Sequence, residues 1–190
     1  APLNAIDKIA SAKISFAWAE NDHSQIREIY RKSSLYLFLL GGFLFLNINV
    51  NIHTLLRFLP SGDEEGEIVV YIISIGTLFN MATGLNASIL FNSEKFRFGA
   101  FFLVLLAGII LALQMFLIPI YGIAGAAIAT CIASLIYNLM LFLTVWKFFG
   151  LQPFERGNVR VLLSLILCFG IGLMIPHPDN KILDIIIRSG

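Results

Sequence analysis

The feature that most constrains the fold is a long tract without charge. From Phe98 to Trp146 there is no Lys, Arg, Asp, Glu or His. A membrane-spanning helix needs about 20 apolar residues, so this tract is long enough for two. Charged residues make up 13% of the 190 and apolar residues 58%, whereas an average soluble domain is about 25% charged. The sequence therefore predicts an all-α polytopic membrane protein.

Hydropathy predicts five full transmembrane helices with partial helices at both ends. The full spans are expected at Leu35–Leu59, Ile68–Phe91, Phe98–Ile118, Ile123–Trp146 and Val159–Ile175. A more polar helix, Leu3–Ala19, comes before them, and the truncated start of another, Ile182–Ile187, comes after them. Because the chain begins without Met and stops inside an apolar segment, we expect it to be a piece of a longer protein.

The loop charges alternate along the chain. The first, third and fifth connections contain the basic residues Arg27, Arg31, Lys32, Lys95, Arg97, Lys147, Arg156 and Arg160. The second and sixth contain only Arg57 and Lys181, each near acidic residues, and the fourth is uncharged. Since Lys and Arg collect in cytoplasmic loops, this pattern predicts a multi-pass protein whose basic loops face the cytoplasm.

The two ends of the first span carry their own patterns. In "ENDHSQIREIYRKSS", Asp22 and Gln25 are spaced for a capping box, and apolar residues recur at helical intervals. This pattern predicts a cytoplasmic amphipathic connector that comprises residues 22–34. A plain helical extension of the span is an equal alternative. At the far end, "NINVNIH" alternates polar and apolar residues. A lone strand in lipid leaves its backbone unsatisfied, so we expect a frayed or kinked helix end there.

The stretch "IPIYGIAGAAIAT", residues 118–130, predicts a turn between two helices. A dinucleotide-binding loop needs a preceding strand and an acidic residue about 20 positions later, but the next carboxylate is Glu155. Small residues instead form two rows with a spacing of four, one beginning at Gly122 and the other comprising Gly125, Ala129 and Ala133. Such rows let helices approach closely in lipid, which predicts a close-packed hairpin.

Several segments resemble a known transporter family. "APLNAIDKIASAKISFAWAENDHSQIREIYRKSS", "MATGLNASIL", "IPIYGIAGAAIAT" and "WKFFGLQPF" occur in that order between Ala1 and Phe154. Together they resemble the polysaccharide-unit flippases of the multidrug/oligosaccharidyl-lipid/polysaccharide exporter superfamily. The resemblance implies a two-lobed helical fold around a central cavity. Residues 1–147 would form the second-lobe membrane domain, and 148–190 a cytoplasmic loop with truncated accessory helices.

The resemblance also implies a function. A flippase of this kind moves undecaprenyl-pyrophosphate-linked oligosaccharide from the cytoplasmic to the outer leaflet of the bacterial inner membrane. The expected partners are that lipid-linked substrate, membrane lipid and an N-terminal lobe of the same chain, with no cofactor. Nucleic acid is not expected, because the net charge of +1 comes with no basic stripe.

The candidate substrate-binding residues come from local chemistry. A polar stripe about 100° wide runs along the first helix through Asn4, Asp7, Lys8, Ser11 and Ser15. At membrane depth such a stripe faces a cavity or another helix, and Lys8 is placed to meet a pyrophosphate or to pair with a carboxylate such as Asp7. Lys13 is a further candidate on the opposite side, where snorkelling to the interface is the alternative. In the second span, Asn80 and Asn86 are candidates for lining a sugar cavity, but interhelical hydrogen bonding is favoured.

Two other function classes fit the residues less well. A cation-coupled exporter of small amphipathic compounds usually needs an intramembrane carboxylate, and only Asp7 is available outside the full spans. A membrane enzyme needs paired carboxylates or a motif such as HExxH. The three histidines, His23, His53 and His177, lie far apart at span ends or in loops. We therefore expect a transporter without enzymatic activity, and the exporter is the alternative.

Overall fold

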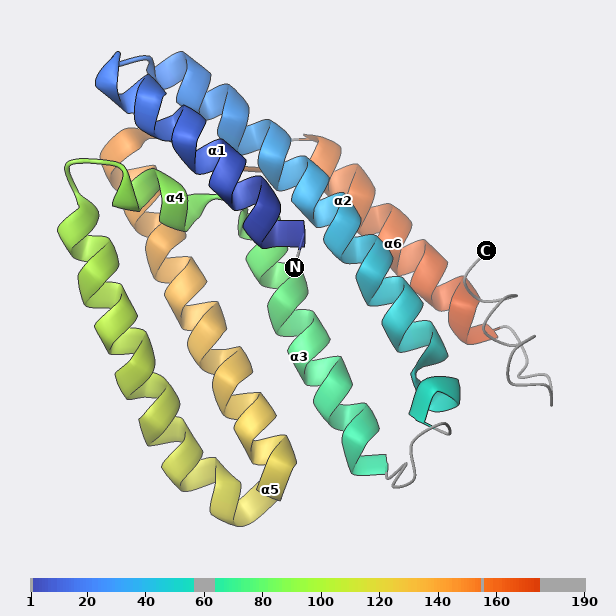
Figure 1. Ribbon diagram of the computed structural model, residues 1–190. Coiled ribbons are helices and arrows are strands. Elements are labelled where there is room, and N and C mark those ends of the chain that lie inside the picture. The colour runs from blue at the N-terminus through green and yellow to red at the C-terminus, as the bar shows by residue number, and fades with distance from the viewer. Residues whose placement is uncertain (1, 57–63, 155, 175–190) are drawn as a thin grey trace.

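The computed structural model describes residues 2–56, 64–154 and 156–174, and every regular element among them is an α-helix (Figure 1). This confirms the all-α prediction. The helices are α1 (Pro2–Ala19), α2 (His23–Leu56), α3 (Glu64–Thr83), α4 (Asn86–Phe91), α5 (Phe96–Phe149) and α6 (Arg156–Met174). The residues expected to start a further helix, Ile182–Ile187, lie outside the described part.

Three of the described helices are long and apolar enough to cross a membrane. The segments are His23–Ile52 of α2, Gly66–Thr83 of α3 and Phe96–Phe149 of α5. The apolar part of α6, Gly157–Ile171, is shorter than a span. The structure thus supports a membrane protein with three candidate spans, one of which, α5, doubles back on itself. These helices do not establish the count of five.

The hairpin predicted from "IPIYGIAGAAIAT" is present within α5. Gly122 has φ 56° and ψ −131°, and Figure 1 shows the chain reversing there. A φ in this region is open to Gly at no steric cost. A Cβ on Gly125 would lie against the backbone carbonyl of Leu117, so the two arms meet at their backbones. Ala129 and Ala133 of the same row are fully buried. Small side chains are therefore what allows this close approach.

The second span differs from the sequence prediction. A single helix was expected over Ile68–Phe91, but the structure breaks it into α3 and α4. Gly84 lies at the break with φ 65°, and the Ser34 hydroxyl of α2 donates to the Ala82 carbonyl at 2.7 Å. The prediction of one continuous helix is wrong because a left-handed glycine and a hydrogen bond from α2 end α3 early.

α2 is longer and more regular than predicted. It begins at His23, and residues 23–34 continue directly into the span as one helix. This agrees with the alternative prediction of a helical extension. The "NINVNIH" segment also stays helical, and the prediction of a frayed or kinked end is wrong as far as Leu56. Side chains of Asn47, Asn49 and Asn51 each donate to a carbonyl four residues earlier. These bonds satisfy the amide nitrogens within the helix, whereas the buried side-chain oxygen of Asn49 accepts no hydrogen bond from the described residues.

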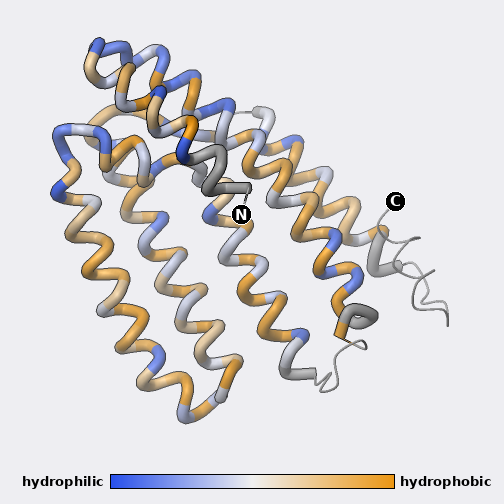
Figure 2. The backbone as a smooth tube through the Cα atoms, in the orientation of Figure 1, coloured by the Kyte–Doolittle hydropathy of each residue, from blue (hydrophilic) through white to orange (hydrophobic). Residues whose placement is uncertain are grey.

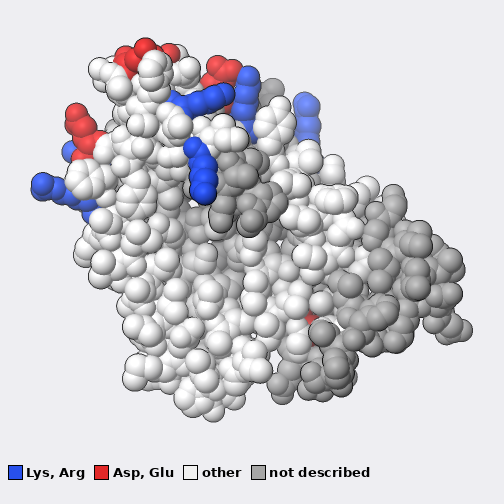
Figure 3. Space-filling model, in the orientation of Figure 1, with Lys and Arg blue, Asp and Glu red and all other residues white. Residues whose placement is uncertain are grey.

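The helices pack side by side with α2 near the centre. α2 contacts α1, α3 and α6, while α3 also packs against α5, and short α4 lies against α1 and α5. In Figure 2 the long helices are mostly apolar along their length, and polar residues collect towards one end. Almost all charged side chains visible in Figure 3 lie towards that same end.

Three of the described connections lie at the same end of the molecule. The α1–α2, α4–α5 and α5–α6 connections lie at the charged end, which we call the basic end, and the Gly122 turn lies at the other (Figure 1). Away from the basic end, α5 exposes large apolar side chains, including Phe101 at 61%, Met115 at 77% and Ile123 at 72%. An exposed apolar surface of this extent marks contact with lipid or another protein.

Candidate functional site

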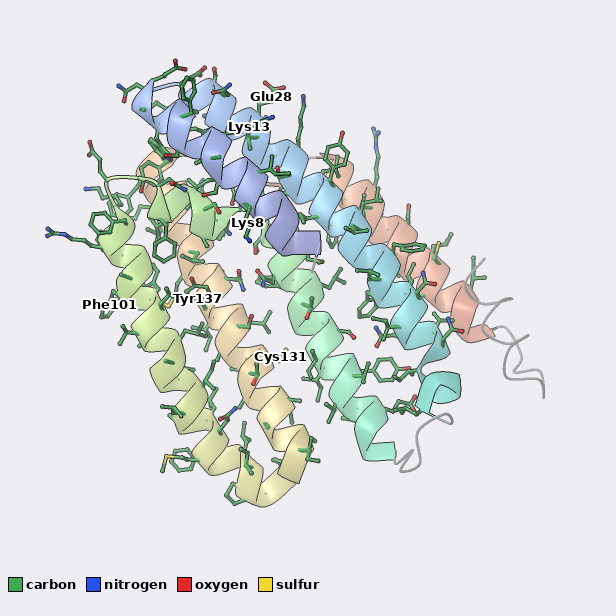
Figure 4. The ribbon with its side chains drawn as sticks, in the orientation of Figure 1. Lys8, Lys13, Glu28, Phe101, Cys131 and Tyr137 are labelled. Atoms are coloured by element: carbon green, nitrogen blue, oxygen red, sulfur yellow. The ribbon has the colours of Figure 1, made fainter. Side chains whose placement is uncertain are left out.

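The polar stripe on α1 is the best-supported candidate site. Lys8 and Ser15 are exposed and Ser11 is half-buried. Figure 4 places Lys8 on the part of α1 that lies over α4, away from Lys13. Asn4 and Asp7 belong to the same stripe, but their side chains lie outside the described residues. The stripe therefore offers one accessible ammonium followed by two hydroxyl groups.

A hydrogen bond ties this stripe to the α4–α5 connection. The Asn92 amide donates to the Ser11 hydroxyl oxygen at 2.9 Å and to the Ser88 carbonyl at 2.7 Å. Ser11 thus packs α1 against the end of α4 as well as belonging to the candidate site. The sequence analysis did not predict this link between Asn92 and α1.

Beyond Ser11 the stripe reaches a pocket of about 510 Å³ at the basic end. Ser15, Trp18, Asn92 and Phe149 are among the residues that line it. The rings of Trp18 and Phe149 meet edge to face, with centroids 4.8 Å apart. The buried indole N–H of Trp18 has no hydrogen-bond acceptor within the described part of the chain. An aromatic wall beside hydroxyl and amide groups suits a ligand that is apolar on one face and polar at its edge.

Sequence reasoning missed Trp18 and Phe149 as pocket residues. The available signal was a tryptophan near the end of a helix, one residue before the polar turn "ENDHS". Phe149 lies 131 positions later, in the last turn of α5. Only the packing of α5 beside α1 brings the two rings together.

Lys13 lies on another face of α1. It lines a groove between α1 and α2 with Phe16, Glu28 and Lys32. Lys8 is not among the residues that line this groove.

Asn80 and Asn86 do not line a common wall, because the break at Gly84 separates them. Asn86 is buried, and its side-chain oxygen accepts a hydrogen bond from the Tyr30 hydroxyl. This is the interhelical bond that the sequence favoured over a sugar contact. Asn80 is half-buried, and its backbone carbonyl accepts from the Thr83 hydroxyl at 2.9 Å. Neither amide reaches the stripe of Lys8.

Ionisable groups that might hold a metal are scattered. Among the described residues no three His, Cys, Asp or Glu side chains cluster closely enough to hold a metal ion. Cys131 is half-buried in α5, and Cys168 is exposed on α6. The stripe and its pocket therefore contain hydroxyl and amide groups, two aromatic rings and four ionisable side chains. The ionisable ones are Lys8 on the stripe and His23, Glu94 and Lys95 in the pocket lining.

The long apolar helices define the class of an α-helical protein suited to a membrane, with the candidate site at its basic end. No known protein family matches the sequence, and no curated protein does.

Proposed function

We propose that the protein belongs to a transporter that moves undecaprenyl-pyrophosphate-linked oligosaccharide from the cytoplasmic to the outer leaflet of a bacterial inner membrane. The observation that carries this proposal is the single face of α1. On it, the exposed ammonium of Lys8 precedes Ser11 and Ser15, and Ser15 lines the pocket of Trp18 and Phe149.

Each part of this face suits one part of the substrate. A pyrophosphate is strongly anionic, and a lysine ammonium is a point charge that pairs with it without demanding a fixed geometry. Sugar hydroxyls both donate and accept hydrogen bonds, so they can pair with the exposed Ser15 hydroxyl and with the side-chain oxygen of Asn92, two residues that line the pocket. The apolar faces of sugar rings can stack on the aromatic wall. The lipid tail would stay against the exposed apolar surface of the helices.

The distribution of charge suggests an orientation. Basic loops concentrate on the cytoplasmic side of membrane proteins, and this chain has its basic connections at one end. We propose that this end faces the cytoplasm, where a lipid-linked unit carrying a completed saccharide would first meet the pocket. The resemblance to the flippase family adds an N-terminal lobe as the other wall of the cavity.

The test uses the full-length protein in its own cell. The gene is deleted, lipid-linked saccharides are extracted, and their sidedness is read with a label that reacts only at the outer leaflet. We expect complete units to accumulate on the cytoplasmic side and wild-type protein to restore their export. Lys8→Ala should fail to restore it. Lys147→Ala is the matched control, because Lys147 is exposed at the same end but lies on α5, outside both the α1 stripe and the pocket.

Two results would overturn the proposal. If the lipid-linked pools stay unchanged while the deletion strain becomes sensitive to cationic compounds, the protein is instead an exporter of small molecules. If Lys8→Ala and Lys147→Ala restore export equally well, the α1 face is not the substrate site even if the transporter class holds.

A further inference from the structure

A second surface lies on the other side of α1, at the same basic end. It is a groove of about 550 Å³ between α1 and α2, and the residues that line it include Lys13, Phe16, Glu28 and Lys32. Figure 4 shows Lys13 and Glu28 close together at this end, on neighbouring helices. We refer to this surface as the α1–α2 groove.

The charges in the groove favour an anion. Lys13 has no ion-pair partner among the described residues, and its side chain is exposed. Lys32 pairs with Glu28 at 2.6 Å, and both side chains are about two-thirds exposed, at 66% and 63%. An exposed pair one turn apart on a helix is weak and is screened by salt. An anionic group entering between the helices can therefore recruit both ammoniums.

Two apolar stripes lead away from the groove. On α1, Ile9 lies one turn from Lys13 and seven residues from Phe16, and these two apolar side chains are 66% and 62% exposed. On α2, Tyr36 lies one turn beyond Lys32, and Leu39 and Phe43 continue the same stripe, each more than half exposed. Residues three, four and seven apart share one helix face. Each wall of the groove thus continues as an apolar track along its helix.

We propose that the α1–α2 groove binds an anionic phospholipid of the leaflet at the basic end, with the phosphate between Lys13 and Lys32. Its two acyl chains would lie along the tracks of α1 and α2. Basic residues between helices at a membrane surface are known to bind anionic head groups, and each contributes about 1 kcal/mol of attraction near the surface. This site goes beyond the proposed transport function, because Lys13 lines the α1–α2 groove and not the pocket of Trp18 and Phe149.

The lipid, rather than a free phosphate, is the occupant that matches the whole surface. A soluble phosphate would use only the two ammoniums and leave the exposed tracks uncovered. A phospholipid matches the ammonium groups and the apolar tracks together, since its phosphate pairs with the lysines and its acyl chains cover Phe16 and Tyr36. Glu28 lines the groove, and its negative charge opposes the binding of an anion. Replacing Glu28 should therefore raise the affinity for the lipid, whereas replacing Lys13 should lower it.

The test measures lipid binding to the full-length protein purified in detergent. Phosphatidylglycerol and phosphatidylcholine are titrated separately and bound lipid is counted by native mass spectrometry. We expect phosphatidylglycerol to bind more tightly. Lys13→Gln should weaken it about five-fold, the equivalent of one lysine at the surface. Glu28→Gln should strengthen it, because the change removes a negative charge and releases Lys32.

Lys147→Gln is the control, as it removes a lysine at the same end outside the groove. All three positions are exposed, so the fold should be retained, and thermal unfolding checks this. Equal binding of the two lipids, or weakening by Glu28→Gln, overturns the proposal. Displacement of phosphatidylglycerol by undecaprenyl pyrophosphate, with the same response to Lys13→Gln, would assign the groove to the transported lipid instead. Binding of inorganic phosphate alone at the same strength would assign it to a soluble anion.

Discussion

The hydroxyl of Tyr30 donates a hydrogen bond to the side-chain oxygen of Asn86, 56 positions further along the chain. Both residues are buried, Tyr30 completely and Asn86 to within 1%. The bond joins α2 to α4, a helix of only six residues. Because α4 leads into Asn92 and the pocket, this contact fixes the position of the candidate site relative to α2.

Removing the donor should destabilise the protein. Tyr30→Phe leaves the Asn86 oxygen buried without a donor, and we expect a loss of about 1–3 kcal/mol. The amide nitrogen of Asn86 already lacks a partner, so the side chain would then have none among the described residues. The measurement is thermal unfolding of the purified protein in detergent.

A second variant separates the hydrogen bond from packing. Tyr30→Phe combined with Asn86→Leu replaces both polar partners by apolar groups of similar size, which is close to neutral in buried sites. We expect the double variant to recover most of the stability lost by Tyr30→Phe. If the stability losses of Tyr30→Phe and Asn86→Leu simply add in the double variant, the hydrogen bond does not hold α4 in place.

The stability of the α5 hairpin should depend much more on Gly125 than on Gly108. Gly125→Ala puts a methyl group against the Leu117 carbonyl and should cost about 1–3 kcal/mol through overpacking. Gly108 lies in the same helix, and a methyl group added there would have no atom within 4 Å. Gly108→Ala should leave stability unchanged or raise it by about 0.5–1 kcal/mol, since Ala is the better helix former. Equal effects in a thermal unfolding assay would contradict the proposed close approach.

The start of α2 should be sensitive to acid. The Asp22 carboxylate accepts hydrogen bonds from the Ser24 hydroxyl and from the backbone amides of Ser24 and Gln25, at 2.5–3.1 Å. The Ser24 hydroxyl, followed by the Gln25 amide, holds the pKa of Asp22 below its ordinary value of 3.8. A lowered pKa means that the carboxylate stabilises the fold fully above its ordinary pKa. This contribution is lost as the pH falls through the lower pKa of the folded protein.

Two substitutions at Asp22 test this cap. Asp22→Asn should keep the cap, since Asn is an equally good N-cap residue, while removing its titration. Asp22→Ala should lower stability at all pH values. Circular dichroism melting curves from neutral to strongly acidic pH provide the measurement. If wild type and Asp22→Asn lose stability in parallel, other groups account for the acid sensitivity.

Substitutions at Ser11 and Lys8 should distinguish an effect on stability from an effect on transport. Ser11→Ala removes the acceptor of the Asn92 amide and should lower stability by about 1 kcal/mol. Lys8 is exposed, so Lys8→Ala should leave stability nearly unchanged while reducing export of lipid-linked saccharide. Thermal unfolding and the sidedness assay are run on both variants. Loss of stability in Lys8→Ala would point to a structural ion pair instead of a substrate contact.

Much of the architecture could be predicted from local sequence. The uncharged tract from Phe98 to Trp146 requires apolar helices, and Pro119 with Gly122 requires a turn between them. The row of Gly125, Ala129 and Ala133 predicts close packing. These features need only the length of a span, the steric freedom of glycine and the spacing of small side chains. The Asp22 cap was also predictable from residues a few positions apart, although the Asp22 amide donates to the Ala17 carbonyl and not to Gln25.

The tertiary structure decided what depends on distant contacts. Helical periodicity runs smoothly through Gly84, but the Ser34 hydroxyl on α2 binds the Ala82 carbonyl and the helix ends there. The pocket of Trp18 and Phe149 likewise depends on how the end of α1 meets the last turn of α5. Hydropathy and spacing describe one segment at a time. They determine which helices form, whereas pairing between helices decides where each ends and which side chains meet.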